Sequence, residues 1–160
     1  MHNNLSSRVI VFFASCFQFV VGAFLASMAC IGTTDVTLQK HRLLVAGAVL
    51  TGLVSRLVIA EMLQRTIGRK RPFAAKNLIP LVWMRPSAPS FPSGHASVFF
   101  GIAWYIAFSS PLLSLPFFAA ALLISGARVL AHVHYWSDVA AGIPVGLAGA
   151  LIIKWIMGFF

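Results

Sequence analysis

Long apolar stretches separated by short polar ones dominate this 160-residue chain. Five of them are candidate membrane spans, at roughly 9–31, 43–63, 95–108, 112–130 and 139–157. A span needs about 20 residues, so the third is short unless its helix continues through residues 109–111. Backbone groups inside lipid must be bonded within their own segment, and alternating ten-residue strands are not visible. We therefore predict an all-α polytopic membrane bundle of about five transmembrane helices.

The first apolar stretch also has some features of a secretory signal peptide. Arg8 precedes the apolar run, and residues 27–29, Ser-Met-Ala, resemble a cleavage site. The run is longer than the roughly 7–15-residue apolar core of a signal peptide, so we expect a retained first helix. We expect one integral-membrane domain over residues 1–160, with a motif-bearing core at about 43–157.

Composition narrows the possible partners. The chain is 59% hydrophobic with a mean hydropathy of +0.91, yet its net charge is +9. Such hydropathy argues against a soluble nucleic-acid-binding protein. A basic excess in a membrane protein suits anionic headgroups or a phosphorylated substrate. We expect the bilayer and a membrane lipid phosphate as partners, and no nucleic acid.

The long polar stretch at residues 64–93 connects the second and third predicted helices. Five prolines in it argue against one continuous helix. In an alternating bundle, the end of the second helix, the start of the third, the end of the fourth and the start of the fifth lie at one membrane face. The active site is expected at this face, where the topology gathers the chemically active residues Arg71, Ser93, Gly94, His95, Arg128, His134 and Asp138.

His134 and Asp138 have the i,i+4 spacing of side chains that meet on one helix face, if the fifth helix begins near His134. A carboxylate bonded to one imidazole nitrogen leaves the other free as a nucleophile. Taken alone, such a pair also occurs as a self-satisfied structural contact. Its proximity to Arg128 favours the catalytic interpretation.

Residues 91–95, Phe-Pro-Ser-Gly-His, have the composition of an open helix N-terminus, where backbone N–H groups favour an anion. An ordinary N-cap is the alternative interpretation. His95 changes the balance, because an imidazole beside a phosphate can protonate a leaving oxygen. Arg71 and Arg128 are suited to the equatorial oxygens of a phosphoryl group. Arg56 lies inside the second apolar stretch, where a charge is functional by default. A structural pairing with Glu61 is at least an equal alternative, so we leave Arg56 out of the site.

Arg71-Pro72, Pro92-Ser93-Gly94-His95 and Arg128-x5-His134-x3-Asp138 together resemble the three-part signature of the type 2 phosphatidic acid phosphatase (PAP2) superfamily. The resemblance covers nearly half the chain and implies a small bacterial-type lipid phosphatase. It makes His134 the nucleophile that becomes phosphohistidine, with Asp138 as its orienting partner and His95 as the general acid. It assigns phosphate binding to Arg71, Ser93, Gly94 and Arg128, with no metal and no cofactor.

Two positions depart from the family pattern. The lysine that usually lies seven residues before the first arginine is replaced by Gln64, which brings a hydrogen-bond donor but no charge. We include Gln64 among the phosphate-binding residues, with Arg65 as a possible replacement cation. The serine that often precedes the third-block arginine is replaced by Ala127, and Ser125 is a partial substitute.

The substrate and the membrane side stay open. We expect a hydrolase of the cell envelope that converts undecaprenyl diphosphate to undecaprenyl phosphate. Phosphatidic acid, phosphatidylglycerophosphate, lipid A phosphates and polyprenyl-phosphoribose phosphates are alternative substrates. A degenerate protein that binds anionic lipid without turnover is the non-enzymatic alternative, and a small transporter or channel subunit is a weaker one.

We expect a multi-pass protein of the inner (plasma) membrane. The resemblance favours a periplasmic, extracytoplasmic site, whereas positive charge favours the cytoplasm. The charge argument rests on eight basic residues at the site-bearing face, Arg8, Arg65, Arg69, Lys70, Arg71, Lys76, Arg85 and Arg128. The opposite face has three, Lys40, Arg42 and Lys154.

Overall fold

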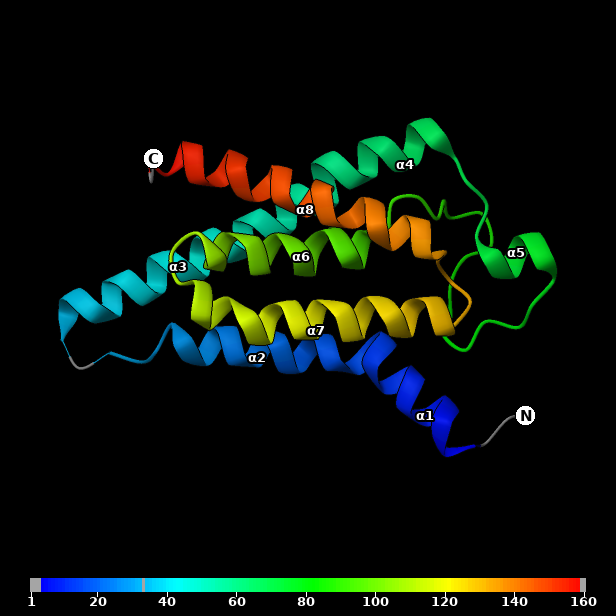
Figure 1. Ribbon diagram of the computed structural model, residues 1–160, viewed down its shortest axis with the longest axis horizontal. Helices are drawn as coiled ribbons and strands as arrows, with labels where there is room; N and C mark the ends of the chain where they lie inside the picture. The colour runs from blue at the N-terminus through cyan, green and yellow to red at the C-terminus, as the bar shows by residue number, and fades with distance from the viewer. Residues whose placement is uncertain (1–3, 33, 159–160) are drawn as a thin grey trace.

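The computed structural model describes residues 4–32 and 34–158, and all regular structure in them is helical (Figure 1). The elements follow the order α1 (Leu5–Val11), η1 (Phe12–Cys16), α2 (Phe17–Met28), α3 (Asp35–Leu53), η2 (Val54–Ala60), α4 (Glu61–Ile67), α5 (Pro72–Lys76), α6 (Gly94–Ala107), α7 (Pro111–Leu130) and α8 (Trp136–Ile156). The segments η1 and η2 are π-helical turns inside longer helices.

Among the described residues, four stretches are long and apolar enough to cross a membrane: Leu5–Met28, Asp35–Lys76, Pro111–Leu130 and Trp136–Ile156. The helix of the second stretch is interrupted at residues 68–71, before α5. The fifth, α6, is apolar but has only 14 residues. It ends at Ala107, and Pro111 starts a new helix, so the extension of the third helix through residues 109–111 does not occur. Proline is favoured in a first helical turn, where its missing N–H leaves no bond unmade. The predicted all-α membrane bundle is confirmed.

Helix α6 is the centre of the bundle and packs against α3, α7 and α8. Small residues allow it to approach α8 closely. A Cβ atom on Gly142 would lie 2.5 Å from Cβ of Ala96, and one on Gly146 would lie 2.5 Å from the backbone nitrogen of Gly101. Close backbone approach through small residues is the usual way in which membrane helices gain packing energy. The position of α6 is therefore set by its contact with α8.

The two π-helical turns change which residues face inward. A π turn contains one residue more than an α turn, so it shifts the register of the helix beyond it. In Figure 1, α1 is angled away from the line of α2, and η1 lies between the two. In η2, the turn directs Ser55 towards Gly149 and lays Arg56 against Gly94.

One end of the bundle collects the polar chain segments. The end of α4, the start of α6, the end of α7 and the start of α8 all lie at the right-hand side of Figure 1, as the alternating topology predicted. Residues 68–93 cover this end as an irregular segment that contains the short helix α5. The prediction that the prolines prevent one continuous helix is confirmed.

Candidate active site

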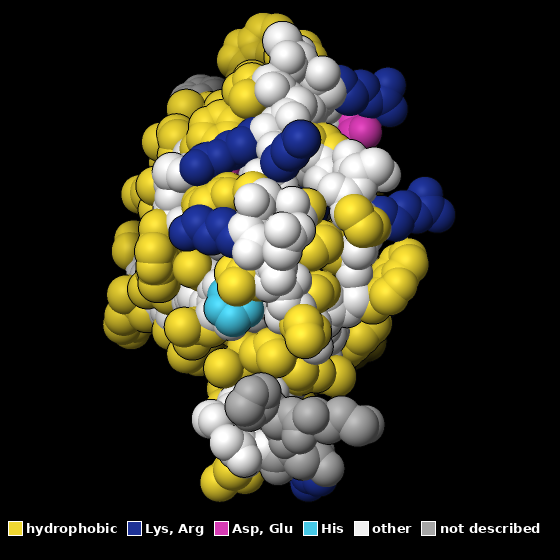
Figure 2. Space-filling view, turned by 90° about the vertical axis from the view of Figure 1, so that its right-hand side faces the viewer, with side chains coloured by type: hydrophobic (Ala, Val, Ile, Leu, Met, Phe, Trp, Pro, Cys, Tyr) yellow, Lys and Arg dark blue, Asp and Glu magenta, His cyan; other side chains and the backbone are white. Residues whose placement is uncertain are grey.

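A polar pocket of about 310 Å³ opens at this end of the bundle. Figure 2 shows the same end from outside, with basic side chains spread among hydrophobic ones and few acidic side chains. The pocket is lined by Arg56, Glu61, Gln64, Arg65, Arg71, Met84, Ala88, Pro89, Gly94, His95, Arg128 and His134. Four guanidinium groups and one carboxylate give this lining a net positive charge that suits an anion.

His134 lies in the connection between α7 and α8 and is 2% exposed. Its Nδ1 is 2.9 Å from the carbonyl oxygen of Ser90. A carbonyl oxygen can only accept, so Nδ1 carries the proton and Nε2 keeps its lone pair. Nε2 is 3.1 Å from Nη1 of Arg71, on the wall of the pocket. A phosphorus atom that approaches Nε2 therefore brings its oxygens to a guanidinium.

Burial lowers the pKa of the His134 imidazole from its ordinary value to about 4. The contact with Asp138 works in the opposite direction on this pKa, whereas the charges of Arg71 and Arg128 lower it further. The imidazole is therefore neutral at neutral pH, as a nucleophilic nitrogen must be.

Asp138 has a different position from the one that the spacing implied. Helix α8 begins at Trp136, so His134 precedes the helix instead of lying on its face. Oδ2 of Asp138 is 3.4 Å from Nδ1 of His134, but it accepts a hydrogen bond from the backbone N–H of Tyr135 at 2.8 Å. Oδ1 accepts one from Arg69 at 2.8 Å. The carboxylate caps the helix and is near the imidazole, while Ser90 makes the orienting hydrogen bond.

Arg71 is buried, and three backbone carbonyls hold its guanidinium. Nε donates to Ala88 at 3.0 Å, Nη2 to Pro89 at 2.9 Å and Nη1 to Val133 at 2.8 Å. Ala88 and Pro89 belong to the irregular segment 68–93, and Val133 belongs to the connection before α8. The irregular segment thus fixes the direction of Arg71, which preorganises this cation beside His134.

Arg128 is only 5% exposed, and Nη1 donates to the carbonyl of Ala14 in η1 at 3.1 Å. Its Nε has no hydrogen-bond partner among the described residues. A buried cationic N–H without a partner carries a desolvation cost of about 1–3 kcal/mol or more. A phosphate oxygen in the pocket would remove this cost, so Arg128 fits the predicted anion.

The N-terminus of α6 contributes Gly94 and His95 to the pocket lining, but not Ser93. The hydroxyl of Ser93 accepts from the N–H of Ala96 at 3.4 Å and is fully buried, so in this structure Ser93 is the ordinary N-cap. His95 Nε2 is 3.1 Å from Oε1 of Gln18 in α2. Sequence reasoning missed Gln18 and Ser90, because neither belongs to a motif and the Ser90 contact uses a backbone carbonyl.

Gln64 is buried and lines the pocket, but its Nε2 donates to the carbonyl of Pro92 at 2.8 Å. Arg65 also lines the pocket, with Nε 3.1 Å from Glu61 and a side chain that is 78% exposed. Ser125 is buried and does not belong to the lining residues. The structure therefore places Gln64 and Arg65 at the pocket, and not Ser125.

Arg56, which the sequence analysis left outside the site, lines the pocket. Its predicted pairing occurs, with Nη1 2.8 Å from Glu61, but the side chain also lines the pocket. A Cβ atom on Gly94 would lie 2.5 Å from Nε of Arg56. The extra residue in η2 turns Arg56 towards the start of α6, and apolar periodicity does not reveal such a turn.

The chain is similar in sequence to curated bacterial proteins. The bacitracin transport permease protein BcrC of Bacillus licheniformis is 31% identical over 120 residues, which is 72% of this chain and 57% of that protein. The lipid A 1-phosphatase of Rhizobium etli is 32% identical over 94 residues, covering 56% of this chain and 40% of the relative. The chain thus spans about half the length of the curated relatives that it matches.

The fold is shared with solved crystal structures. The PAP2-type phosphatidylglycerolphosphate phosphatase of Bacillus subtilis matches with a TM-score of 0.59 at 25% identity, covering 96% of this chain and 75% of that structure. LpxE of Aquifex aeolicus matches with a TM-score of 0.61 at 21% identity, covering 91% and 92%. The profile of the PAP2 superfamily matches residues 44–160, which include every predicted site residue. The chain therefore belongs to the PAP2 superfamily.

Proposed function

We propose that this protein is an integral-membrane lipid phosphatase that removes the terminal phosphate of a polyprenyl diphosphate, with undecaprenyl diphosphate as the best candidate, through a phosphohistidine on His134. One observation carries the proposal: the unprotonated Nε2 of a neutral, buried histidine lies 3.1 Å from Nη1 of Arg71, a guanidinium that backbone carbonyls hold in a cationic pocket. Two of the relatives are phosphatases by name, a lipid A 1-phosphatase and a phosphatidylglycerolphosphate phosphatase, which supports the same reaction class.

In the first step, Nε2 of His134 attacks the terminal phosphorus and an N–P bond forms. The bond from phosphorus to the lipid-side oxygen breaks, and this oxygen takes a proton from the imidazolium form of His95, which becomes neutral. Arg71 and Arg128 bind the equatorial oxygens, where the transition-state charge collects. Asp138, 3.4 Å from Nδ1, stabilises the positive charge that the phosphorylated imidazole acquires.

In the second step, a water molecule attacks the phosphohistidine. His95, now neutral, takes a proton from this water as the new O–P bond forms. The N–P bond breaks, which returns His134 to its neutral form and releases inorganic phosphate. Both steps use only side chains of the pocket, so we propose that turnover continues without a metal ion.

An apolar groove of about 300 Å³ next to the pocket supports a lipid substrate. It is lined by Gln18, Val21, Gly22, Leu25, Val49, Gly52, Leu53, Arg56, Leu57, Val98, Phe99 and Ile102. Arg56 lines both cavities, and Gln18 joins the groove to His95 of the pocket. We propose that the hydrocarbon tail lies in this groove while the phosphate lies in the pocket.

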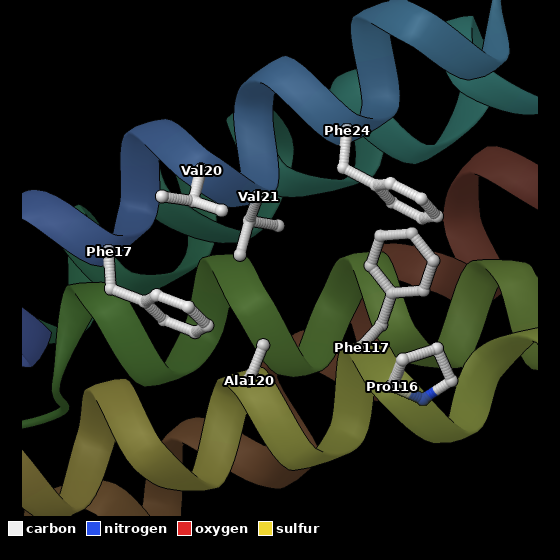
Figure 3. A pocket seen from close by; sticks show the side chains of 7 residues that line it. All are labelled: Phe17, Val20, Val21, Phe24, Pro116, Phe117 and Ala120. Atoms are coloured by element: carbon white, nitrogen blue, oxygen red, sulfur yellow. The ribbon is translucent and has the colours of Figure 1, made fainter.

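A second apolar groove lies on another side of α2, against α7, and Figure 3 shows its lining. The residues are Phe17, Val20, Val21, Phe24, Pro116, Phe117 and Ala120. None of them contacts the pocket through a hydrogen bond, and none lines it. This difference favours the groove that contains Gln18 and Arg56 as the place for the tail.

The experiment is phosphate release by purified protein in detergent from a panel of undecaprenyl diphosphate, phosphatidic acid, phosphatidylglycerophosphate, a lipid A phosphate and a polyprenyl-phosphoribose phosphate. We expect release that is fastest with the diphosphate, persists in EDTA and is blocked by vanadate. His134→Ala should abolish release. His132→Asn is the matched control, because His132 is exposed, has a positive φ of 63° that asparagine tolerates, and does not line the pocket.

Full activity in His134→Ala would contradict the phosphohistidine. Binding of these lipids without any release would support the non-enzymatic alternative, a protein that only binds anionic lipid. A clear preference for phosphatidic acid, phosphatidylglycerophosphate or lipid A would replace the proposed substrate while the reaction stays the same.

We propose further that the site faces the extracytoplasmic side of the bacterial inner membrane, as the resemblance implies. A single cysteine at the exposed Ser87, in a protein with Cys16→Ser and Cys30→Ser, tests the side. A membrane-impermeant thiol reagent should label it in intact cells from which the outer barrier has been removed. Labelling only after lysis would place the site in the cytoplasm, as the charge distribution favours.

A further inference from the structure

We propose that Arg56 binds the lipid-side phosphate of a lipid diphosphate and thereby selects diphosphates over monophosphates. This inference rests on the proposed function and adds the residue that recognises the second phosphate. In the signature of the family, the cation of the first block is a lysine at the position of Gln64. In this chain, Arg56 supplies a cation from eight residues earlier, within η2 and inside the second apolar stretch.

Arg56 lies where the two cavities meet, because it lines both the polar pocket and the apolar groove. A lipid diphosphate that spans them places its terminal phosphate in the pocket and its tail in the groove. The phosphate between these two parts then lies at the junction, beside Arg56. A monophosphate has no charged group at that point.

The chemistry of the site places Arg56 on the side of the leaving group. The attacking and leaving atoms are roughly in line on opposite sides of phosphorus. His134 is the attacking group, so the leaving oxygen faces His95. Arg56 packs on Gly94, the residue before His95, where a Cβ atom would lie 2.5 Å from Nε. When a diphosphate reacts, the leaving group is a lipid phosphate, and its charge develops next to this guanidinium.

The charges around Arg56 favour the binding of an anion. The N-terminus of α6 is the positive end of a helix dipole, and a cation beside it is unfavourable without compensation. One carboxylate, Glu61, bonds to both Arg56 and Arg65, at 2.8 and 3.1 Å. Two guanidiniums and one carboxylate leave a net positive charge. The Arg56 side chain is 36% exposed, so its remaining N–H groups are accessible from the cavities.

The π-helical turn η2 explains how Arg56 and Gln64 reach the same pocket. Eight residues of regular α-helix turn through about 80° more than two full turns, which would separate the two side chains around the helix. A wider turn between them reduces this difference. The amide N–H of Gln64 is already bonded to Pro92, and the Arg65 side chain is 78% exposed, so Arg56 is the more buried of the two cations that this helix places at the pocket.

The test compares kcat/KM for farnesyl diphosphate and farnesyl monophosphate in the wild type and in Arg56→Gln. A charge-assisted hydrogen bond contributes about 1.5–3 kcal/mol, so we expect a loss of about 10- to 100-fold with the diphosphate. With the monophosphate, we expect a change within about threefold. Arg56→Lys should retain part of the preference. Arg85→Gln removes an exposed charge that does not line the pocket and is the matched control.

Equal losses with the two substrates would overturn the inference, because they would show a structural or general phosphate-binding role. Dissociation constants in a His134→Ala background separate this inference from the proposed function. There, Arg56→Gln should weaken binding of the diphosphate at least tenfold and leave the monophosphate nearly unchanged. If Arg56→Gln shows this difference in binding but the wild type releases no phosphate, only the proposed function is contradicted. If Arg56→Gln changes the binding of diphosphate and monophosphate equally, the role of Arg56 is contradicted. Size-exclusion profiles verify that the variants are folded.

Discussion

Gln18 in α2 and His95 at the start of α6 are joined by a hydrogen bond, with Oε1 and Nε2 3.1 Å apart across 77 residues of sequence. An amide oxygen accepts, so the bond fixes a proton on Nε2 of His95. A helix without any catalytic motif therefore positions the imidazole that we propose as the general acid.

Gln18→Ala should slow hydrolysis more for a substrate whose leaving group is more basic. Protonation by the acid matters most for a basic alkoxide, so we expect about a tenfold loss with a lipid monophosphate. An aryl phosphate, whose phenolate leaves without much help, should lose less than about threefold. The ratio of kcat/KM for the two substrates is the measurement. Equal losses would show that Gln18 acts on a step that both substrates share.

The acidic limb of the pH profile should lie well below the ordinary histidine pKa of about 6.5. Protonated His134 cannot attack, and burial lowers its pKa to about 4, so activity should fall only as the pH drops towards this value. The phosphate of the substrate titrates as well, near pH 6. Profiles of kcat/KM for two substrates with different phosphate pKa values distinguish the titration of His134 from that of the substrate. The limb caused by His134 lies at the same pH with both substrates, whereas the limb caused by the phosphate moves. A common limb near 6.5 would contradict this assignment.

Gly22→Phe should fill the groove that we propose for the tail. A Cβ atom on Gly22 meets nothing within 4 Å, so the larger side chain enters open space without disturbing the helix packing. We expect about a tenfold rise in KM for a long-chain lipid phosphate and little change for a short-chain one. Val20→Phe adds similar bulk to the groove of Figure 3 and is the control. A loss of long-chain preference in Val20→Phe alone would move the tail to that groove.

Gln64→Lys should strengthen anion binding. A lysine at this buried position brings to the pocket the charge that Gln64 lacks, and a charge-assisted hydrogen bond is roughly twice as strong as a neutral one. We expect the inhibition constant of vanadate to fall about tenfold. Gln64→Met, which has no donor, should leave it within about threefold, since the Gln64 amide N–H is used by Pro92. An unchanged constant in Gln64→Lys would show that residue 64 does not reach the anion.

The sequence predicted the helices well because each apolar stretch is long compared with a turn and is bounded by polar residues. It also predicted that Arg71, His95, Arg128 and His134 meet, because alternation of spans alone brings their helix ends together. The same argument predicted which end of the bundle carries the site. These predictions depend on topology and on motif residues, and both can be read from the chain.

What the sequence did not predict is local geometry. The expected approach of Asp138 to His134 is present, at 3.4 Å, but the sequence did not predict that α8 begins only at Trp136 or that the carbonyl of Ser90 makes the shorter contact with Nδ1. The π turn that directs Arg56 into the pocket has no compositional signature, since Val54–Ala60 is as apolar as the helix around it. Contacts such as Gln18 with His95 depend on how α2 lies against α6, which the sequence does not specify.

The short length of α6 has a consequence for how substrate arrives. Fourteen residues span about 21 Å, against about 31 Å for the 21 residues of α8. Figure 1 shows that α6 begins short of the ends of its neighbours α7 and α8 at the polar end of the bundle. We therefore expect the reaction centre to lie at the level of the lipid headgroups, where a lipid can reach it by diffusing within its own leaflet. Turnover should then follow the mole fraction of substrate in the membrane, a surface-dilution behaviour, rather than its concentration in the bulk solution.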